Sequence, residues 1–365
     1  MPVTILNGHC LEVLKTLESE SVNCCVTSPP YWGLRDYGVP GQIGLEPTIA
    51  EYLDIIGEVF QEVWRVLKKD GTLWLNLGDA YATGGYQPHN KGAIGNKKCP
   101  SGWTAKARGQ GAMKTIGGTI KPKDLLGIPW RVAFTLQENG WYLRSDIVWS
   151  KPNPMPESVR DRPTKAHEYI FLLTKSPVYY YDNQAIREPL RDSSVARVMQ
   201  DIENQEGSDR ANGGQKTNGK MKAVIFGGNK SEGYGGRRYS GKEWNPKMAG
   251  GGSGISGHKG YFKEDGTPVC GSMANKKTVW NIPTVGLKEA HFATFPPKLI
   301  EPCILAGAPE GGTVLDPFFG AGTTGLVADR LNRNCIGIEL NPGYINIAEK
   351  RIKEDSGLFA EVVRA

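Results

Sequence analysis

Apolar residues occur along the chain in two alternating patterns, as short continuous runs and as longer stretches with helical spacing. The short runs predict strands at residues 3–6, 22–26, 72–77, 313–315 and 335–338, and residues 142–149 also fit a strand. The longer stretches predict helices at residues 10–17, 51–67, 125–137, 298–305 and 326–331. This alternation of strands and helices favours an α/β fold with a mostly parallel sheet.

Two local signals refine this expectation. Residues 168–174 and 178–181 are typical of the two strands of a β-hairpin that turns at Lys175-Ser176-Pro177. Such a hairpin would add an antiparallel edge to the sheet. Asp70-Gly71 is a turn signal, and it predicts that the next strand starts after it, at residue 72.

The length of 365 residues suits one large core with insertions better than three compact domains. Residues 184–277 are rich in Gly, Asn, Ser and Lys and contain few apolar runs, so they can bury little core of their own. We therefore expect residues 1–183 and 278–365 to build one core, and residues 184–277 to form a separate, loop-rich region.

The net charge is +6, but the positive charge is concentrated in two segments and the rest of the chain is net acidic. Residues 84–123 carry eight Lys or Arg residues and no Asp or Glu, and residues 184–277 carry 16 Lys or Arg residues against 10 Asp or Glu. Basic segments of this kind neutralise phosphates and release counterions, which favours binding to nucleic acid. A flexible, solvated loop is the alternative. The candidate DNA contacts in these segments are Lys97, Lys98, Lys106, Arg108, Arg237 and Arg238.

The composition argues against several other classes of protein. None of the seven cysteines has a paired metal-binding spacing such as C-x-x-C, and no His/Cys cluster or carboxylate pair has ligand spacing. We therefore expect reduced core cysteines and no metal. The chain has neither a basic start followed by an apolar segment nor about 18 consecutive apolar residues, so we expect no membrane association and a location in the cytoplasm.

Two short motifs carry the candidate chemistry, and each follows a predicted strand. In the first, Thr27-Ser28-Pro29-Pro30-Tyr31, two consecutive prolines stiffen a loop that presents a serine and a tyrosine. The second is Asp316-Pro317-Phe318-Phe319-Gly320-Ala321-Gly322-Thr323-Thr324-Gly325. Its glycines fall in a strand-to-helix turn, where a ligand can approach the backbone. The first motif suits a planar substrate and the second a nucleoside.

An acidic residue strengthens the interpretation of the second motif. Glu339 ends the next predicted strand about 20 residues further along, which is the spacing expected for recognition of ribose hydroxyls. No Gly-Lys-Ser/Thr follows the glycines, which argues against a phosphate-binding P-loop. Together, Asp316, the glycines and Glu339 predict a Rossmann-like nucleoside site.

The two motifs and Ile336-Gly337-Ile338-Glu339-Leu340-Asn341 resemble those of the S-adenosylmethionine-dependent DNA amino-methyltransferases. Their order, with the catalytic motif first and the cofactor motif last, is similar to that of the β group and of type II modification methylases. The resemblance covers residues 1–83, 125–182 and 278–353. It implies a prokaryotic or phage origin and a Rossmann-like methyltransferase fold with a mostly parallel seven-stranded sheet and an antiparallel hairpin. Residues 84–123 and 184–277 would then be loop-rich insertions, the latter for target recognition.

The resemblance also implies which residues bind the cofactor, S-adenosylmethionine. Residues 291–297 match a family segment that covers its methionine moiety. The implied contacts are Thr294, Phe295, Asp316, Pro317, Phe318, Gly320, Gly322, Thr323, Thr324, Glu339 and Asn341. One departure is His9, which stands where many relatives have an acidic residue.

For catalysis, the resemblance implies that the Ser28 hydroxyl and the Pro29 carbonyl accept hydrogen bonds from the exocyclic amine of a target base. Such bonds localise the lone pair of the amine for in-line attack on the sulfonium methyl. Pro30 completes this corner, and Tyr31 stacks on the base after it has flipped out of double-stranded DNA.

Two further predictions concern the surroundings of this corner. Residues 149–156 resemble a family segment near the flipped base, so Lys151 and Asn153 are expected to meet phosphate or base. Methylation of a ring carbon would instead require a cysteine nucleophile. The obvious candidate, Cys303, lies in a helix-like run just before the strand that leads to the glycine motif. This order of the two motifs is wrong for ring-carbon methyltransferases, so we predict that Cys303 is a core residue.

Serine at position 28 is typical of cytosine-N4 enzymes in the family, whereas aspartate there is typical of adenine-N6 enzymes. We therefore predict methylation of cytosine N4 in double-stranded DNA, with adenine N6 as the alternative. Methyltransferases of RNA or of protein glutamine share a similar Pro-Pro-Tyr corner, but their glycine motif normally precedes it. A non-catalytic DNA-binding module is a third alternative. A cognate restriction endonuclease and a homodimer are left open.

Overall fold

The computed structural model describes residues 1–34, 36–82, 121–189, 273–286, 294–356 and 361–364. The chain divides into two units, one made of Met1–Ile186 and Lys277–Ala365 and the other of Arg187–Lys276. The described part of the second unit is an antiparallel pair of short strands, β6 (Glu188–Pro189) and β7 (Met273–Ala274). Since most of residues 184–277 lie outside the described residues, their role in target recognition stays a prediction.

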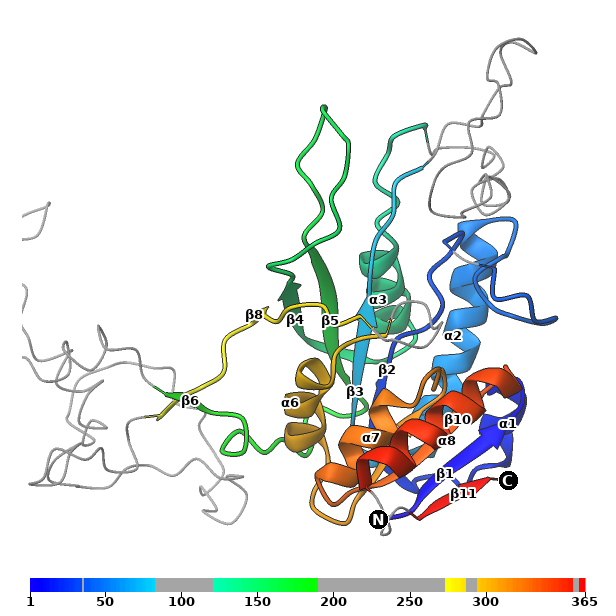
Figure 1. Cartoon of the computed structure of the whole chain (residues 1–365), viewed down its shortest axis with the longest axis vertical. Coiled ribbons are helices and arrows are strands. Elements are labelled where there is room, and N and C mark those ends of the chain that lie inside the picture. Colours follow the sequence, from blue (N-terminus) through cyan, green and yellow to red (C-terminus); the bar gives the residue numbers. More distant parts are fainter. Residues whose placement is uncertain (35, 83–120, 190–272, 287–293, 357–360, 365) are drawn as a thin grey trace, which may run out of the picture. The chain divides into compact units, whose positions relative to one another are not determined.

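A nine-stranded sheet forms the centre of the first unit, in the order β11-β1-β10-β9-β2-β3-β5-β4-β8 (Figure 1). Its strands are β1 (Val3–Asn7), β2 (Val22–Thr27), β3 (Leu67–Leu77), β4 (Tyr142–Ser150), β5 (His167–Thr174), β8 (Val279–Asn281), β9 (Thr313–Asp316), β10 (Asn334–Glu339) and β11 (Val362–Arg364). Neighbouring strands are parallel except where β5 pairs with β3 and β4. The predicted α/β class with a mostly parallel sheet is confirmed. The described sheet has nine strands rather than seven because β8 and β11, of three residues each, extend its two edges.

Helices cover both faces of this sheet. One hydrophobic cluster joins it to α1 (Cys10–Thr16), α2 (Ile49–Val66) and α3 (Ile128–Glu138), and a second joins it to α6 (Pro297–Gly307), α7 (Thr323–Arg330) and α8 (Pro342–Ser356). Successive strand residues alternate between the clusters: Leu73 and Leu75 belong to the first and Trp74 to the second. A strand buried on both faces is continuously apolar, which explains why the short runs in the sequence show no polar alternation.

The predicted hairpin around Lys175-Ser176-Pro177 was wrong in its second strand. Residues 178–181 form no strand, because β5 is already paired along both edges, with β3 and with β4. Instead, the ring of Tyr181 stacks on that of Trp74 with centroids 6.3 Å apart. The antiparallel hairpin is formed by β4 and β5, whose connection spans residues 151–166.

Two predicted boundaries also differ. The strand expected at residue 72 begins at Leu67 and runs through the predicted Asp70-Gly71 turn, and its register with β2 shifts between Val22 and Cys24. The helix expected from residue 125 begins at Ile128, after Gly127 in a left-handed conformation with φ 68°. A proline in the first turn of α3 favours this later start.

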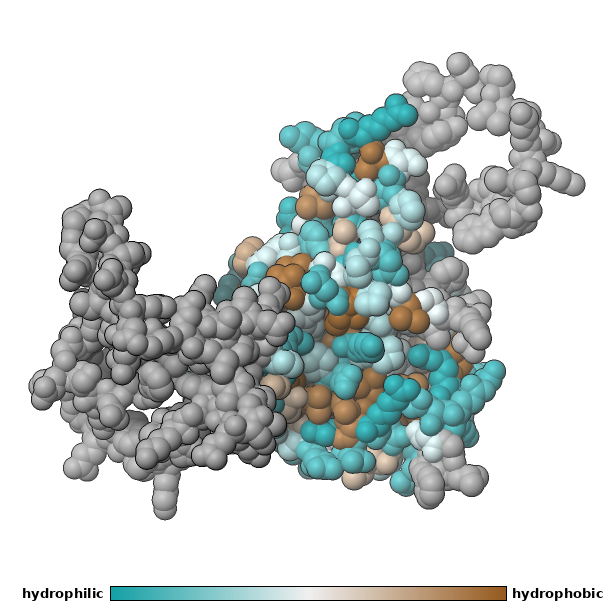
Figure 2. Space-filling model, turned by 60° about the vertical axis from the view of Figure 1, so that its left-hand side comes forward, coloured by the Kyte–Doolittle hydropathy of each residue, from teal (hydrophilic) through white to brown (hydrophobic). Residues whose placement is uncertain are grey.

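On the face shown in Figure 2, hydrophilic residues surround groups of hydrophobic ones. In the part of the chain that the structure describes, no helix has the length and apolar character needed to cross a membrane.

The sheet topology brings the ends of several strands to one edge. Because β1, β10, β9, β2, β3 and β4 run in the same direction, their carboxyl ends meet there, and the antiparallel β5 begins there. In open α/β sheets, ligands bind beyond the carboxyl ends of the strands. Ser28, which follows β2, Asp316, which ends β9, and Glu168 in β5 all lie at this edge.

Candidate active site

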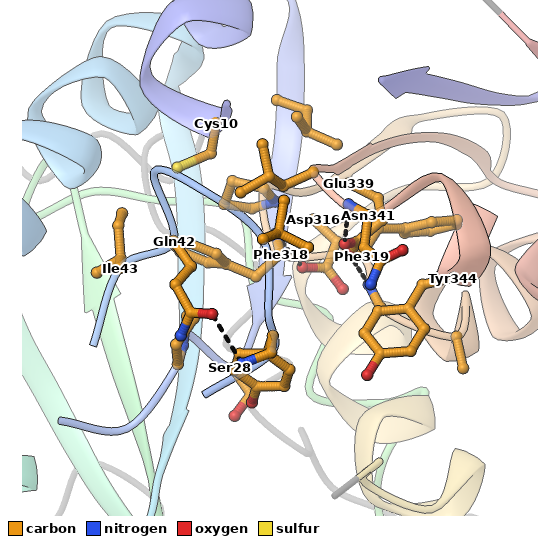
Figure 3. Close-up of a pocket in the computed structure, with 18 of the residues that line it drawn as sticks. Cys10, Ser28, Gln42, Ile43, Asp316, Phe318, Phe319, Glu339, Asn341 and Tyr344 are labelled. Carbon is orange, nitrogen blue, oxygen red and sulfur yellow. Dashed lines mark hydrogen bonds between the residues drawn. The ribbon is translucent and has the colours of Figure 1, made fainter. Parts of the chain in front are cut away.

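One cavity at this edge is lined by both sequence motifs (Figure 3). It encloses about 940 Å³ of space free of protein atoms, including its open mouth, which is within the size range of small-molecule sites. Its walls come from the ends of four strands and from the connecting segment 37–43. The residues that line it are Gly8, His9, Cys10, Ser28, Pro30, Tyr37, Val39, Gly41, Gln42, Ile43, Thr294, Phe295, Asp316, Pro317, Phe318, Phe319, Gly320, Ala321, Thr323, Ile338, Glu339, Leu340, Asn341 and Tyr344.

Glu339 is held in this cavity by two backbone groups. The Gly320 N–H donates to Oε2 at 2.7 Å and the Asn341 N–H donates to Oε1 at 2.8 Å (Figure 3). Burial raises the pKa of Glu339, although these two N–H donors oppose the shift. The carboxylate is therefore fixed in orientation, and each oxygen keeps a second acceptor position for a ligand.

Asp316 is almost completely buried and binds three partners. Its Oδ1 accepts from the Thr27 hydroxyl at 2.6 Å and from the Phe318 N–H at 3.0 Å, and its Oδ2 accepts from the Thr324 hydroxyl at 2.6 Å. Burial raises the pKa of Asp316 to about 6. Its role in the structure is thus to tie the glycine turn to the end of β2.

Most of the predicted cofactor contacts face the cavity, but two lie behind its wall. Gly322 caps α7 in a left-handed conformation with φ 74°, and a Cβ there would lie 2.7 Å from the Cβ of Ala348. Thr324 is fully buried against Asp316. Both residues shape the turn, whereas Gly320 and Thr323 line the cavity itself.

Several lining residues carried no signal in the sequence. Tyr37, Gln42 and Ile43 belong to a connecting segment without helical or strand periodicity, so nothing in their spacing placed them near either motif. Tyr344 lies in the first turn of α8, close to the predicted Asn341. Its position after the acidic end of β10 is the one signal that could have suggested it.

The first motif forms a corner beside the glycine turn. Ser28 and Pro30 line the cavity, and the Pro30 carbonyl accepts a hydrogen bond from the Tyr52 hydroxyl at 3.0 Å. This bond anchors the two-proline loop to α2. Pro29 and Tyr31 belong to the same corner but do not line the cavity.

The Tyr31 hydroxyl points to the start of β5. It donates to Oε2 of Glu168 at 2.9 Å and accepts from the Ser28 hydroxyl at 3.4 Å. Its ring packs so closely on Gly78 that a Cβ there would lie 2.6 Å from Cε2 of Tyr31. Burial and the Glu168 charge raise the pKa of Tyr31 well above its usual range, so the phenol stays protonated. Stacking of Tyr31 on a base stays a prediction.

The predicted DNA contacts divide into two groups. Lys151 forms an ion pair with Glu168 and its Nζ lies 4.2 Å from the centroid of the Trp149 ring. The Asn153 amide exchanges hydrogen bonds of 3.1 and 2.9 Å with the backbone of Thr284. The other group lies outside the described residues, namely Lys97, Lys98, Lys106, Arg108, Arg237 and Arg238.

The cysteines of the described ranges are buried and form no disulfide; they are Cys10, Cys24, Cys25, Cys303 and Cys335. Cys303 is completely buried in α6 and does not line the cavity, so the prediction that it is a core residue is confirmed. No cluster of His, Cys, Asp or Glu within the described ranges has the arrangement of a metal site. Cys10 does face the cavity, and burial raises the pKa of its thiol to about 12, so it stays protonated.

Comparison with known proteins finds relatives whose sequences match nearly the whole chain. Residues 22–350 match the model of a family described as DNA methylase. The chain is 42% identical over 358 residues to the type II methyltransferase M.Cfr9I of Citrobacter freundii, covering 98% of this chain and 90% of that protein. It is 41% identical over 348 residues to the type II methyltransferase M.SmaI of Serratia marcescens, covering 95% and 90% of the two chains.

Solved structures with the same fold are more distant in sequence. A putative DNA modification methylase from Thermus thermophilus, complexed with S-adenosyl-L-methionine, matches with a TM-score of 0.53 and 19% identity over 100% of this chain and 99% of that one. The PvuII DNA methyltransferase, described as cytosine-N4-specific, matches with a TM-score of 0.52 and 18% identity over 100% and 96% of the two chains. At these identities, the structural matches support the fold.

Proposed function

The chain belongs to the DNA methylase family, whose members methylate exocyclic amines of DNA bases with S-adenosylmethionine, and from that premise we propose that it is a site-specific DNA (cytosine-N4) methyltransferase. One observation carries this proposal. Ser28 of the first motif and Glu339 at the end of β10 line the same cavity. A base held at the first would therefore lie next to a cofactor held at the second.

The residues of the cavity fit the cofactor. The Glu339 carboxylate has one free acceptor position on each oxygen, which suits the two hydroxyls of a ribose. Phe318 and Ile43 offer apolar surface for the adenine, and Gly8 and Gly320 line the wall without side chains. When bound, S-adenosylmethionine supplies an electrophilic methyl group on a sulfonium.

The corner residues prepare the amine for attack. In an exocyclic amine the lone pair is delocalised into the ring, which makes the nitrogen a poor nucleophile. The Ser28 hydroxyl and the Pro29 carbonyl accept one N–H each, and this favours a pyramidal nitrogen whose lone pair points into the cavity. Because Pro30 is anchored to Tyr52, the acceptors are held in place before the base arrives.

The serine at position 28 supports cytosine N4 as the target rather than adenine N6, since serine is typical of the former enzymes in this family. The motif order and the family relationship argue against RNA and protein-glutamine substrates and against a non-catalytic module. The DNA contacts of the basic segments, a cognate restriction endonuclease and a homodimer stay predictions.

The test is incubation of the purified enzyme with S-adenosylmethionine and unmethylated genomic DNA, followed by digestion to nucleosides and mass analysis. N4-methylcytosine is the expected product. N6-methyladenine would show that the target base is wrong. If neither forms although the enzyme binds the cofactor, the proposed DNA substrate is wrong.

A further inference from the structure

A directed row of hydrogen bonds leads from Ser28 to the start of β5. The Ser28 hydroxyl donates to the oxygen of Tyr31, and the Tyr31 hydroxyl donates to Oε2 of Glu168 at 2.9 Å. The first of these bonds is long, at 3.4 Å, as hydrogen bonds in catalytic sites often are before the substrate binds. Both bonds have the same direction, so each hydroxyl accepts on the side of the cavity and donates on the side of Glu168.

Glu168 stands at the end of this row and is paired with a lysine. Its other oxygen, Oε1, accepts from the Lys151 ammonium, which also lies 4.2 Å from the centroid of the Trp149 ring. The Glu168 and Lys151 side chains are only 17% and 18% exposed, so water screens the pair weakly. One oxygen thus faces a cation and the other faces the Tyr31 hydroxyl.

Methylation of an amine creates a proton that has to leave. When the amine attacks, the electron pair of the methyl–sulfur bond goes to sulfur, a nitrogen–carbon bond forms, and the nitrogen becomes a cation. The lost conjugation with the ring makes that cation strongly acidic, so even a carboxylate paired with a lysine can accept its proton. An acceptor in contact with Ser28 is needed because Ser28 already holds one of the N–H groups.

We propose that Ser28, Tyr31 and Glu168 form a proton relay that removes this proton, an inference that rests on the proposed function. The N–H bond of the methylated amine breaks and leaves its electron pair on nitrogen. Its proton passes to Oγ of Ser28, the Ser28 proton to Oη of Tyr31, and the Tyr31 proton to Oε2 of Glu168. The products are a neutral methylated base and a protonated Glu168.

The neighbouring polar groups are poor alternatives. Oδ1 of Asn76 lies 3.4 Å from the Tyr31 hydroxyl, but it belongs to a neutral amide fixed by a 3.0 Å bond to the Tyr169 carbonyl. Asp316 binds Thr27, Thr324 and a backbone N–H. Among the described residues, Glu168 is the carboxylate that hydroxyl groups connect to Ser28. Since the pKa of Tyr31 is raised by burial and by Glu168, the phenol passes a proton in a concerted step and does not form a phenolate.

The experiment measures single-turnover methyl transfer across a range of pH, with wild type, Glu168→Gln, Tyr31→Phe and the double variant. Glutamine keeps the size of Glu168 but cannot take up a proton, and its single amide oxygen can accept from Tyr31 or from Lys151, not from both. The charged groups that face Glu168 are Lys151 and Lys165, while Tyr31 is neutral. Asp316 and Glu339, whose pKa values are raised, also line the cavity, so the part of the acid-side loss of rate that Glu168→Gln removes is the part that reports Glu168.

We expect Glu168→Gln to slow transfer by about a hundredfold and to change the loss of rate at acid pH. Tyr31→Phe interrupts the same relay, so the double variant should be no slower than the slower single variant. Cofactor affinity and thermal unfolding should match those of Glu62→Gln, a control that also removes one carboxylate of an ion pair, here with Arg65 in α2.

The relay is overturned if wild type methylates DNA and Glu168→Gln keeps the wild-type rate and pH profile. It is also overturned if the two single effects multiply in the double variant, or if the loss of rate follows a loss of cofactor affinity or of folding. If wild type yields no methylated nucleoside, the proposed function and the relay are both wrong.

Discussion

The hydroxyl of Thr27 donates a 2.6 Å hydrogen bond to Oδ1 of Asp316, and this bond joins the two halves of the site. Thr27 ends β2 immediately before Ser28, and Asp316 ends β9 immediately before the glycine turn. The strands are paired in parallel, with Cys25 opposite Leu315. The corner that would hold the base is therefore fixed relative to the turn that would hold the cofactor.

Thr27→Val should destabilise the fold, because valine matches threonine in shape but leaves the buried Asp316 with one donor fewer. We expect a loss of about 2 kcal/mol in the free energy of unfolding, measured by denaturant titration. Thr72→Val is the matched control. Thr72 is also buried in a strand, but its bonds, of 3.3 and 3.5 Å, are to the neutral groups of Trp74 and Cys24, so its loss should be smaller. Equal losses would contradict the importance assigned to the Thr27–Asp316 bond.

Asp316 should make stability depend on pH. Burial raises its pKa from 3.8 to about 6, so the folded protein binds a proton more tightly than the unfolded chain. The proton bound by Asp316 therefore stabilises the folded state. This stabilisation is complete below pH 4 and is lost as the pH rises to about 6. Across this window the free energy of unfolding of wild type, relative to that of Asp316→Asn, should fall by on the order of 3 kcal/mol, since each pKa unit corresponds to about 1.4 kcal/mol. Denaturation curves for both proteins between acid and neutral pH measure it, and a constant difference would contradict the raised pKa.

Gly78→Ala should slow methyl transfer, because the new methyl group would lie 2.6 Å from Cε2 of Tyr31 and displace the ring. We expect a loss of about tenfold or more in the single-turnover rate, with cofactor affinity unchanged. Gly286→Ala is a suitable control, since its Cβ meets no atom within 4 Å. Wild-type transfer by Gly78→Ala would show that the position of Tyr31 does not matter for catalysis.

Glu339→Gln should weaken cofactor binding. An amide cannot accept from both Gly320 and Asn341 as the carboxylate does, so one N–H would face another donor and the side chain would turn. We expect the dissociation constant for S-adenosylmethionine, measured by calorimetry, to rise about tenfold or more. Glu301→Gln, on the exposed surface of α6, should leave it unchanged. An unaltered affinity in Glu339→Gln would contradict the proposed ribose contact.

The sequence predicted the fold class because most strands are buried on both faces and so stand out as apolar runs between helical stretches. Residues 178–181 were misassigned because their composition suits a strand, whereas strand formation needs a free edge, and both edges of β5 are occupied. The three-residue strands β8 and β11 were missed because a segment of that length has no detectable period. Pairing is a property of the whole sheet and cannot be read from a local segment.

The two motifs were recognised from the sequence because each combines restricted backbone geometry with polar side chains in a few consecutive residues. The contact between Tyr31 and Glu168 left no such signal. Those residues are 137 positions apart and meet because the antiparallel β5 begins at the edge of the sheet where the parallel strands β2 and β3 end. Ile43 and Tyr37 were missed for a similar reason, since their segment reaches the cavity through tertiary packing alone.

Single-turnover transfer of labelled methyl from S-adenosylmethionine to unmethylated DNA by wild type and Ser28→Ala tests the central claim most directly, provided that cofactor affinity is measured on the same preparations. We predict that Ser28→Ala binds the cofactor as wild type does but transfers the methyl group about 10² to 10³ times more slowly, because the amine loses an acceptor in the transition state. Transfer by Ser28→Ala at the wild-type rate would contradict the account, because the corner at Ser28 would then not be where the amine is held.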